Sequence, residues 1–173
     1  MAEEKVIDMV DIGTNPHEQH FDVLGTPIPI ARPRMMMMRN GFTHAYLPKT
    51  SREWENNVKD TVANAIVKGD LRRIGSEIPL KITIRLFVPT PKSVPKAERY
   101  LMQIGSLFPP KGDVDNYAKG IMDGMVQAQL IADDRQIVWL DIMKEYSPTP
   151  HAFVSVMELA GIMHTTHKET PNG

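Results

Sequence analysis

Four carboxylates in the second half of the chain have the spacing of a possible metal site. Asp113 and Asp115 flank a single valine, and Asp133 and Asp134 stand side by side further along. Neighbouring carboxylates repel each other, so a shared cation stabilises their charged forms. Hydrolysis of a phosphodiester needs an activated water and neutralised charge at phosphorus, and carboxylate-bound Mg²⁺ supplies both. These acids are therefore candidate Mg²⁺ ligands of a phosphodiester hydrolase.

A lysine extends this set along a predicted helix. Residues 114 to about 129 repeat apolar side chains with helical periodicity. Lys119 lies one turn beyond Asp115 on the same face, with Asn116 and Asp123 nearby on that side. The ammonium group could hold the scissile phosphate or stabilise charge on the leaving oxygen. Asp123 could instead be its ion-pair partner.

Spacing alone leaves a structural alternative open, because surface loops and helix caps often carry an acid-x-acid pair. Asp113 stands where an N-cap belongs, so these acids could simply cap a helix. The chain has no cysteine, which leaves oxygen or imidazole as metal ligands. The six histidines, at positions 17, 20, 44, 151, 164 and 167, share no helical face, so no histidine metal site is expected.

The elements that must position these acids follow from periodicity. Residues 80–88 alternate apolar and polar side chains and predict the clearest strand. Residues 51–68 predict an amphipathic helix, with Ser51 as its possible cap. Residues 136–146 and 151–159 are strand-like, and we expect them to pair as a terminal hairpin.

Proline, glycine and methionine shape the remaining segments. Residues 21–30 predict a strand broken at Gly25, which two prolines confine to an edge or an extended loop. Residues 35–38 are four methionines, predicted to form a buried or half-buried strand. The Asn-Gly pair at 40–41 predicts a hairpin turn. A short basic helix is expected over residues 92–100, in a long, positively charged connection.

Length and composition predict one domain. The chain has 173 residues, 42% of them hydrophobic and 24% charged, as in globular proteins. We expect a loose acidic extension over residues 1–20, a folded domain over 21–160 and a loose tail over 161–173. No apolar run approaches the ~20 residues of a membrane span, and the acidic N-terminus differs from a secretory signal, so a cytoplasmic location is expected.

Charge is unevenly distributed although the net charge is −1. Residues 1–22 hold six acids and one base, whereas residues 32–119 hold 16 Lys or Arg and eight Asp or Glu. This excess predicts a positive surface, although the bases could also be ordinary solvated side chains. The candidate DNA contacts are Arg32, Arg34, Lys49, Arg52, Lys92, Lys96 and Lys111.

The segment from Gly112 to Gln136 (GDVDNYAKGIMDGMVQAQLIADDRQ) resembles the signature of the RusA-like Holliday junction resolvases. That signature is Asp-x-Asp-Asn-x-x-Lys, a helix continuing to another Asp, and then Asp-Asp-x-Gln. A looser similarity in residues 25–34 and in the closing strands extends the resemblance over roughly residues 21–160. The matching positions are Asp113, Asp115, Asn116, Lys119, Asp123, Asp133, Asp134 and Gln136.

The resemblance implies an α/β (α+β) homodimer, with one mixed β-sheet packed by helices. It implies two Mg²⁺-dependent sites, in which Mn²⁺ would substitute, that resolve four-way junctions by paired nicks in DNA recombination and repair. Asp113, Asp115 and Asp134 correspond to the metal ligands and Lys119 to the essential lysine. This chain departs from members with an arginine run before the first acid, because residues 109–112 are Pro-Pro-Lys-Gly.

Three other interpretations remain from the sequence. The same chemistry could act on flaps, forks or other branched intermediates. The chain could bind branched DNA without cutting it, using basic residues and dimer symmetry. It could also be an unrelated α/β domain whose acids cap a helix.

Overall fold

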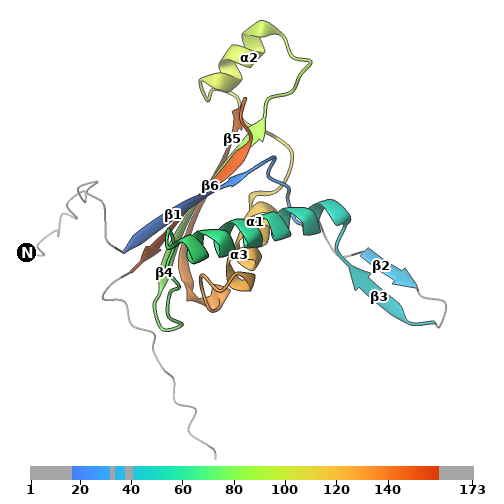
Figure 1. Cartoon of the computed structure of the whole chain (residues 1–173). Coiled ribbons are helices and arrows are strands. Elements are labelled where there is room, and N and C mark those ends of the chain that lie inside the picture. The colour runs from blue at the N-terminus through green and yellow to red at the C-terminus, as the bar shows by residue number, and fades with distance from the viewer. Residues whose placement is uncertain (1–16, 32–33, 38–40, 160–173) are drawn as a thin grey trace, which may run out of the picture.

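The computed structural model describes residues 17–31, 34–37 and 41–159. Most of the predicted loose extension and the predicted loose tail therefore lie outside the described residues. The described chain forms a four-stranded mixed sheet, a separate two-stranded ribbon and three α-helices (Figure 1). Its elements are β1 (Glu18–Leu24), β2 (Arg34–Met37), β3 (Thr43–Tyr46), α1 (Lys49–Lys68), β4 (Leu80–Pro89), α2 (Lys96–Gln103), α3 (Val114–Gln127), the 3₁₀ turn η1 (Asp134–Gln136), β5 (Ile137–Ser147) and β6 (His151–Glu158).

Strand β4 lies inside the sheet, whose order is β1-β6-β4-β5. It pairs in parallel with β5 and antiparallel with β6. The expected terminal hairpin of β5 and β6 is wrong, because β4 lies between them. The physical reason is burial: β4 alternates fully buried Leu80, Ile82, Ile84 and Leu86 with less buried residues, and a neighbour on each side completes its hydrogen bonds.

Helices α1 and α3 pack together over one face of the sheet (Figure 1). The two helices approach closely at Gly124, where a Cβ atom would lie 2.7 Å from Val58 Cγ1. Val58, Ile121 and Met125 are fully buried in this layer. The packing orients α3, so its exposed side carries Asp115 and Lys119.

Within the described residues, strands β1 and β5 are the two edges of this sheet. The edge position of β1 agrees with the prediction from the prolines that follow it. It pairs antiparallel with β6 and ends at Gly25, whose φ of +106° is readily adopted only by glycine. The break predicted at Gly25 is confirmed.

Two predictions in residues 34–51 are wrong in detail. Helix α1 begins at Lys49 after Pro48, so Ser51 lies inside the helix and does not cap it. The Ser51 hydroxyl is buried and instead accepts from the Ala31 N–H at 3.1 Å. The hairpin of β2 and β3 forms as predicted, but Met35, Met36 and Met37 are exposed because the ribbon projects from the body (Figure 1). Met38 and Asn40 lie outside the described residues.

The long connection after β4 contains α2, which stands beyond the ends of β4 and β5 (Figure 1). The helix begins at Lys96, four residues later than the sequence predicted, because Pro95 occupies the N-cap and disfavours helix before it. No helix within residues 17–31, 34–37 and 41–159 is long and apolar enough to cross a bilayer.

Candidate metal and phosphodiester site

The N-terminus of α3 presents two exposed carboxylates. Asp113 occupies the N-cap position with extended backbone angles, but its side chain accepts no capping hydrogen bond. Asp115 lies in the first turn, where the helix dipole favours a negative charge. The N-cap position expected for Asp113 is therefore confirmed. Because its carboxylate is not used for capping, both groups can bind a ligand.

The loop before Asp113 is fixed by two contacts. Gly112 has a φ of +79°, and a Cβ atom there would lie 2.6 Å from Tyr117 Cε2. From β5, the Lys144 ammonium donates to the carbonyl oxygens of Lys111 at 3.1 Å and Gly112 at 2.5 Å. Sequence reasoning missed Lys144, since nothing in the residues around it indicates that β5 faces this loop. These contacts set the position from which Asp113 leaves the loop.

Lys119 lies one turn along α3 and is 59% exposed in its side chain. Its ammonium pairs with the Asp123 carboxylate at 3.4 Å, which is the alternative role that the sequence left open for Asp123. Asp123 is eight residues beyond Asp115, or about 12 Å along the helix axis. Lys119 therefore stands between two acids on the same face.

A hollow of about 370 Å³, here called the acidic hollow, lies beside the second half of α3. Four carboxylates line it, one from α1, one from α3 and two from the turn before β5: Glu55, Asp123, Asp133 and Asp134. The Gln127 amide donates to the Glu55 carboxylate across the hollow. No sequence pattern pointed to Glu55, because α1 and α3 meet only through tertiary packing.

Asp133 and Asp134 have different surroundings. Asp133 caps η1 by accepting from the Arg135 N–H at 2.9 Å. That backbone hydrogen bond, followed by one with the Asp134 side chain, lowers the pKa of the Asp133 carboxyl. Asp134 lies one residue further, inside the 3₁₀ turn. Asp133 therefore has a structural task that Asp134 does not share.

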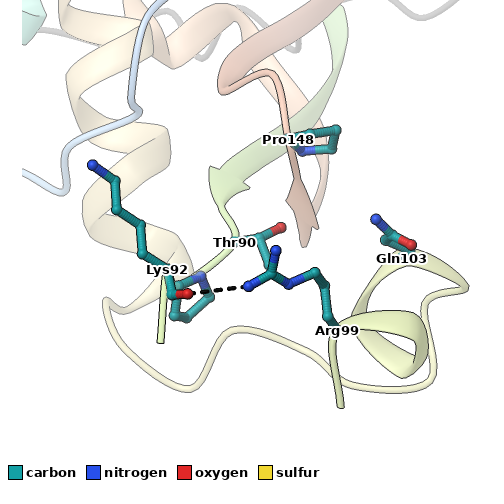
Figure 2. Close-up of a pocket in the computed structure, with 6 residues that line it drawn as sticks. Thr90, Lys92, Arg99, Gln103 and Pro148 are labelled. Carbon is teal, nitrogen blue, oxygen red and sulfur yellow. Dashed lines mark hydrogen bonds between the residues drawn. The ribbon is translucent and has the colours of Figure 1, made fainter. Parts of the chain in front are cut away.

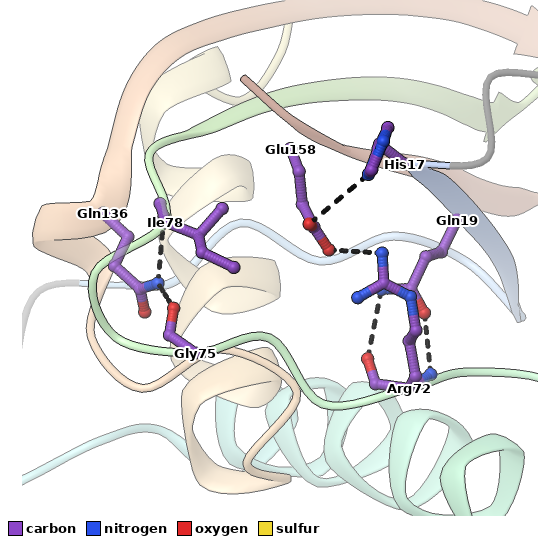
Figure 3. Close-up of polar contacts among 7 residues, drawn as sticks. All are labelled: His17, Gln19, Arg72, Gly75, Ile78, Gln136 and Glu158. Carbon is purple, nitrogen blue, oxygen red and sulfur yellow. Dashed lines mark hydrogen bonds and ion pairs between the residues drawn. The ribbon is translucent and has the colours of Figure 1, made fainter. Parts of the chain in front are cut away.

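Gln136 anchors this acidic turn to the rest of the fold (Figure 3). Its buried side-chain amide donates to the carbonyls of Gly75 at 2.7 Å and Ile78 at 3.1 Å. Its side-chain oxygen accepts from the backbone N–H groups of Ala132 and Asp133. Near the end of β6, Figure 3 shows a second anchor, in which Arg72 pairs with Glu158 at 2.5 Å. The glutamine of the sequence signature is thus a structural residue that holds the two aspartates.

The candidate acids form two sets within one chain. Asp113 and Asp115 lie at the start of α3, and the acidic hollow lies toward its end. Among the described residues, no three acidic or histidine side chains are close enough to hold one ion together. Asn116 lies with the first set, and its backbone carbonyl accepts from the Ile30 N–H at 3.0 Å.

The basic candidates fall into two regions. Lys92, with Arg99 of α2, lines a hollow of about 340 Å³, where the Arg99 guanidinium donates to the Lys92 carbonyl at 3.1 Å (Figure 2). Lys96 begins α2, and Lys111 precedes α3. All of these lie in the connection from β4 to α3, where sequence reasoning missed Arg99.

The second basic region is the start of α1 and the adjoining ribbon. Lys49 pairs with Glu53 at 3.6 Å, and Arg52 donates to the Leu47 carbonyl at 3.5 Å. Arg34 begins β2, and Arg32 lies outside the described residues. Lys49 and Arg52 are exposed, so DNA could reach both.

Comparison with known proteins gives two findings. The family model described as "Endodeoxyribonuclease RusA" matches residues 25–157. "Uncharacterized protein YqaN" of Bacillus subtilis (strain 168) is 31% identical over 147 residues, which cover 81% of this chain and 96% of that protein. The matched region contains both acidic sets and Lys119.

Proposed function

The chain belongs to the RusA endodeoxyribonuclease family, and on this basis we propose that it is a Mg²⁺-dependent endonuclease that cuts four-way DNA junctions. The observation that carries this proposal is the pair of exposed carboxylates at the start of α3, neither of which is used as a helix cap. Family membership supports nuclease chemistry, and the exposed pair supports our assignment of that chemistry to the start of α3.

The residues present fit a magnesium ion. Mg²⁺ prefers oxygen ligands and is commonly held by one or two carboxylates, with waters and substrate phosphate completing its shell. Asp113 and Asp115 supply two such groups without help from a third. When bound, the ion would supply the charge that activates water and neutralises the phosphate. Asp134 lies in the acidic hollow and not beside this pair, so we assign it to a second ion, in preference to Asp133, which is used as a cap.

Lys119 has the task of holding the phosphate. Its ammonium is exposed between the two acidic sets and pairs only at 3.4 Å with Asp123, so a phosphate oxygen could replace that carboxylate. A mobile point charge suffices for this role. In the absence of substrate, the ion pair with Asp123 would keep the Lys119 side chain oriented.

The test is nicking of a synthetic four-way junction with Mg²⁺ or Mn²⁺. We expect Asp115→Asn and Lys119→Gln each to lower the cleavage rate by roughly 10²- to 10³-fold, the range found when one charge-stabilising group is removed. Asp60→Asn is the matched control, because its carboxylate is exposed on α1 away from both acidic sets. Equal rates for Asp115→Asn and Asp60→Asn would refute the assignment.

A protein that binds junctions without cutting them would behave differently in the same assay. It would bind the junction equally well with EDTA and with Mg²⁺, and it would leave the strands intact. Flap and fork substrates run beside the junction separate the neighbouring enzymatic alternatives. We expect the junction to be cut fastest, leaving 5′-phosphate and 3′-hydroxyl ends.

We further propose that the enzyme is a homodimer joined along β5. This strand is one of the two edges of the sheet in the described part of the chain, is 11 residues long, and exposes Val138 (53%), Trp139 (55%), Leu140 (39%) and Met143 (44%). Long apolar edges favour pairing with another strand. Antiparallel pairing of β5 with itself obeys two-fold symmetry and would place these side chains beside their counterparts from the second copy on each face.

Two contacts restrain the orientation of the Trp139 indole on β5. Its N–H donates to the Asp141 carboxylate at 3.1 Å, and the Lys81 ammonium lies 4.2 Å from the ring centroid. A preorganised aromatic ring loses little conformational entropy on binding.

The test of this dimer is its mass in solution. We expect light scattering to give twice the monomer mass for wild type. Leu140→Lys should give the monomer mass, and Val67→Lys, at a position of α1 that is 87% exposed, should stay dimeric. A dimeric Leu140→Lys would rule out this interface.

A further inference from the structure

An apolar cavity of about 380 Å³ lies at the N-terminal end of α3, away from the acidic hollow. Prolines from residues 27–29, 89–91 and 109–110 line it, together with Tyr117 and Tyr146. Its volume lies within the ~300–1,000 Å³ that small-ligand sites occupy. Proline has a fixed φ angle, so these walls are stiff.

The cavity is joined to the candidate metal site through the backbone. Lys111 lines the cavity and precedes Asp113 by two residues. The N–H of Tyr117 donates to the Asp113 carbonyl at 3.3 Å. Lys144 fixes the intervening loop by donating to the Lys111 and Gly112 carbonyls. A group seated in the cavity would therefore lie at a fixed position relative to Asp113.

The residues that line the cavity suit a flat ring attached to a phosphate backbone. The half-buried Tyr146 ring and the prolines offer surfaces for stacking, while the hydroxyls of Thr26 and Tyr146 can meet polar edges. The lining residues include one cation, Lys111, and no acid. The Tyr117 phenol is uncharged at neutral pH, and burial raises its pKa still further.

We propose that this cavity receives one unstacked nucleobase of the branched substrate, an inference that rests on the proposed nuclease function. The continuous base stack is interrupted at a branch point, so moving a base out of the stack there costs less than in an uninterrupted duplex. Stacking on an aromatic side chain replaces part of what is lost. The seated base would fix which phosphodiester lies over Asp113 and Asp115, so the cavity would determine the cleavage position.

The test measures binding of a four-way junction that carries 5-iodouracil beside the branch point, in EDTA so that no strand is cut. Tyr146→Leu should weaken binding roughly 5- to 150-fold, as the loss of one base–aromatic stack does. Its salt dependence should match that of wild type, because no phosphate contact is lost. Tyr146→Phe keeps the ring and should bind within about twofold of wild type. Irradiation of the wild-type complex should crosslink the iodouracil to Tyr146 or Tyr117.

Phe153→Leu is the control, because this half-buried ring of β6 lies tilted against His20 of β1 and is not among the residues that line the cavity. Thermal melting of each variant separates folding loss from binding loss. Equal weakening by Tyr146→Leu and Tyr146→Phe, a changed salt slope, or crosslinks that avoid the cavity would overturn the proposal. A wild-type protein that binds no junction would instead refute the proposed function. Specific crosslinking to an apolar peptide, with none to iodouracil, would mark the cavity as a protein-docking site.

Discussion

Replacement of Gly112 by alanine should damage both the fold and the candidate site. At this position the backbone φ is +79°, and the added Cβ would lie 2.6 Å from Cε2 and 2.9 Å from Cζ of Tyr117. The left-handed backbone costs a residue with a side chain about 1–2 kcal/mol. Forcing the buried ring away adds about 1–3 kcal/mol. We expect a total loss of about 2–5 kcal/mol from a free energy of unfolding of about 5–15 kcal/mol.

Gly105 provides the matched control for this substitution. Its φ is +74°, but nothing lies within 4 Å of the position its Cβ would take. Gly105→Ala should therefore lower the free energy of unfolding only by the cost of the left-handed backbone, about 1–2 kcal/mol. At about 2–4 °C per kcal/mol for a chain of this size, Tm should fall by about 2–8 °C for Gly105→Ala and by about 4–20 °C for Gly112→Ala.

The assay is urea unfolding at 25 °C, followed by junction cleavage at a temperature where both variants are folded. Gly112→Ala should also cut slowly when folded, because Asp113 directly follows it, whereas Gly105→Ala should cut as wild type does. In a Tyr117→Leu background the extra cost of Gly112→Ala should shrink, which a double-mutant cycle measures. Equal destabilisation by both glycine substitutions would refute the contact with Tyr117 as the reason for this glycine.

Three more substitutions test other contacts. Lys144→Met removes the ammonium that donates to the Gly112 carbonyl, and we expect cleavage to fall about tenfold, equivalent to about 1.4 kcal/mol, with little change in Tm. Gly124→Ala places a Cβ 2.7 Å from Val58 Cγ1 and should cost about 1–3 kcal/mol in urea unfolding, less when Val58→Ala makes room. A lowered folded-state pKa means that Asp133 stabilises the fold above its ordinary value of 3.8 and loses that contribution as pH falls through the folded pKa. Urea midpoints of Asp133→Asn should therefore change less with pH below 3.8 than those of wild type; an identical pH profile would contradict the capping role.

The sequence predicted the local elements well where periodicity was strong. The alternation of residues 80–88 predicted β4, and the repeat after Gly112 predicted α3 with Asp113 at its N-cap. These signals are local, because a strand and a helix each place side chains by their own geometry. Burial of the methionine strand was wrong, since hydrophobicity does not reveal that the ribbon of β2 and β3 projects from the body.

The sequence by itself determined the family, the candidate acids and Lys119, because a fixed spacing of chemically distinct residues can be recognised without knowing the tertiary structure. Only the tertiary structure decided that β4 separates β5 from β6 and that Lys144 holds the loop before Asp113. It also brought Glu55 to the acidic hollow. These relations join residues far apart in the chain, and they depend on which strands pair and which helices pack, which no local pattern of residues specifies.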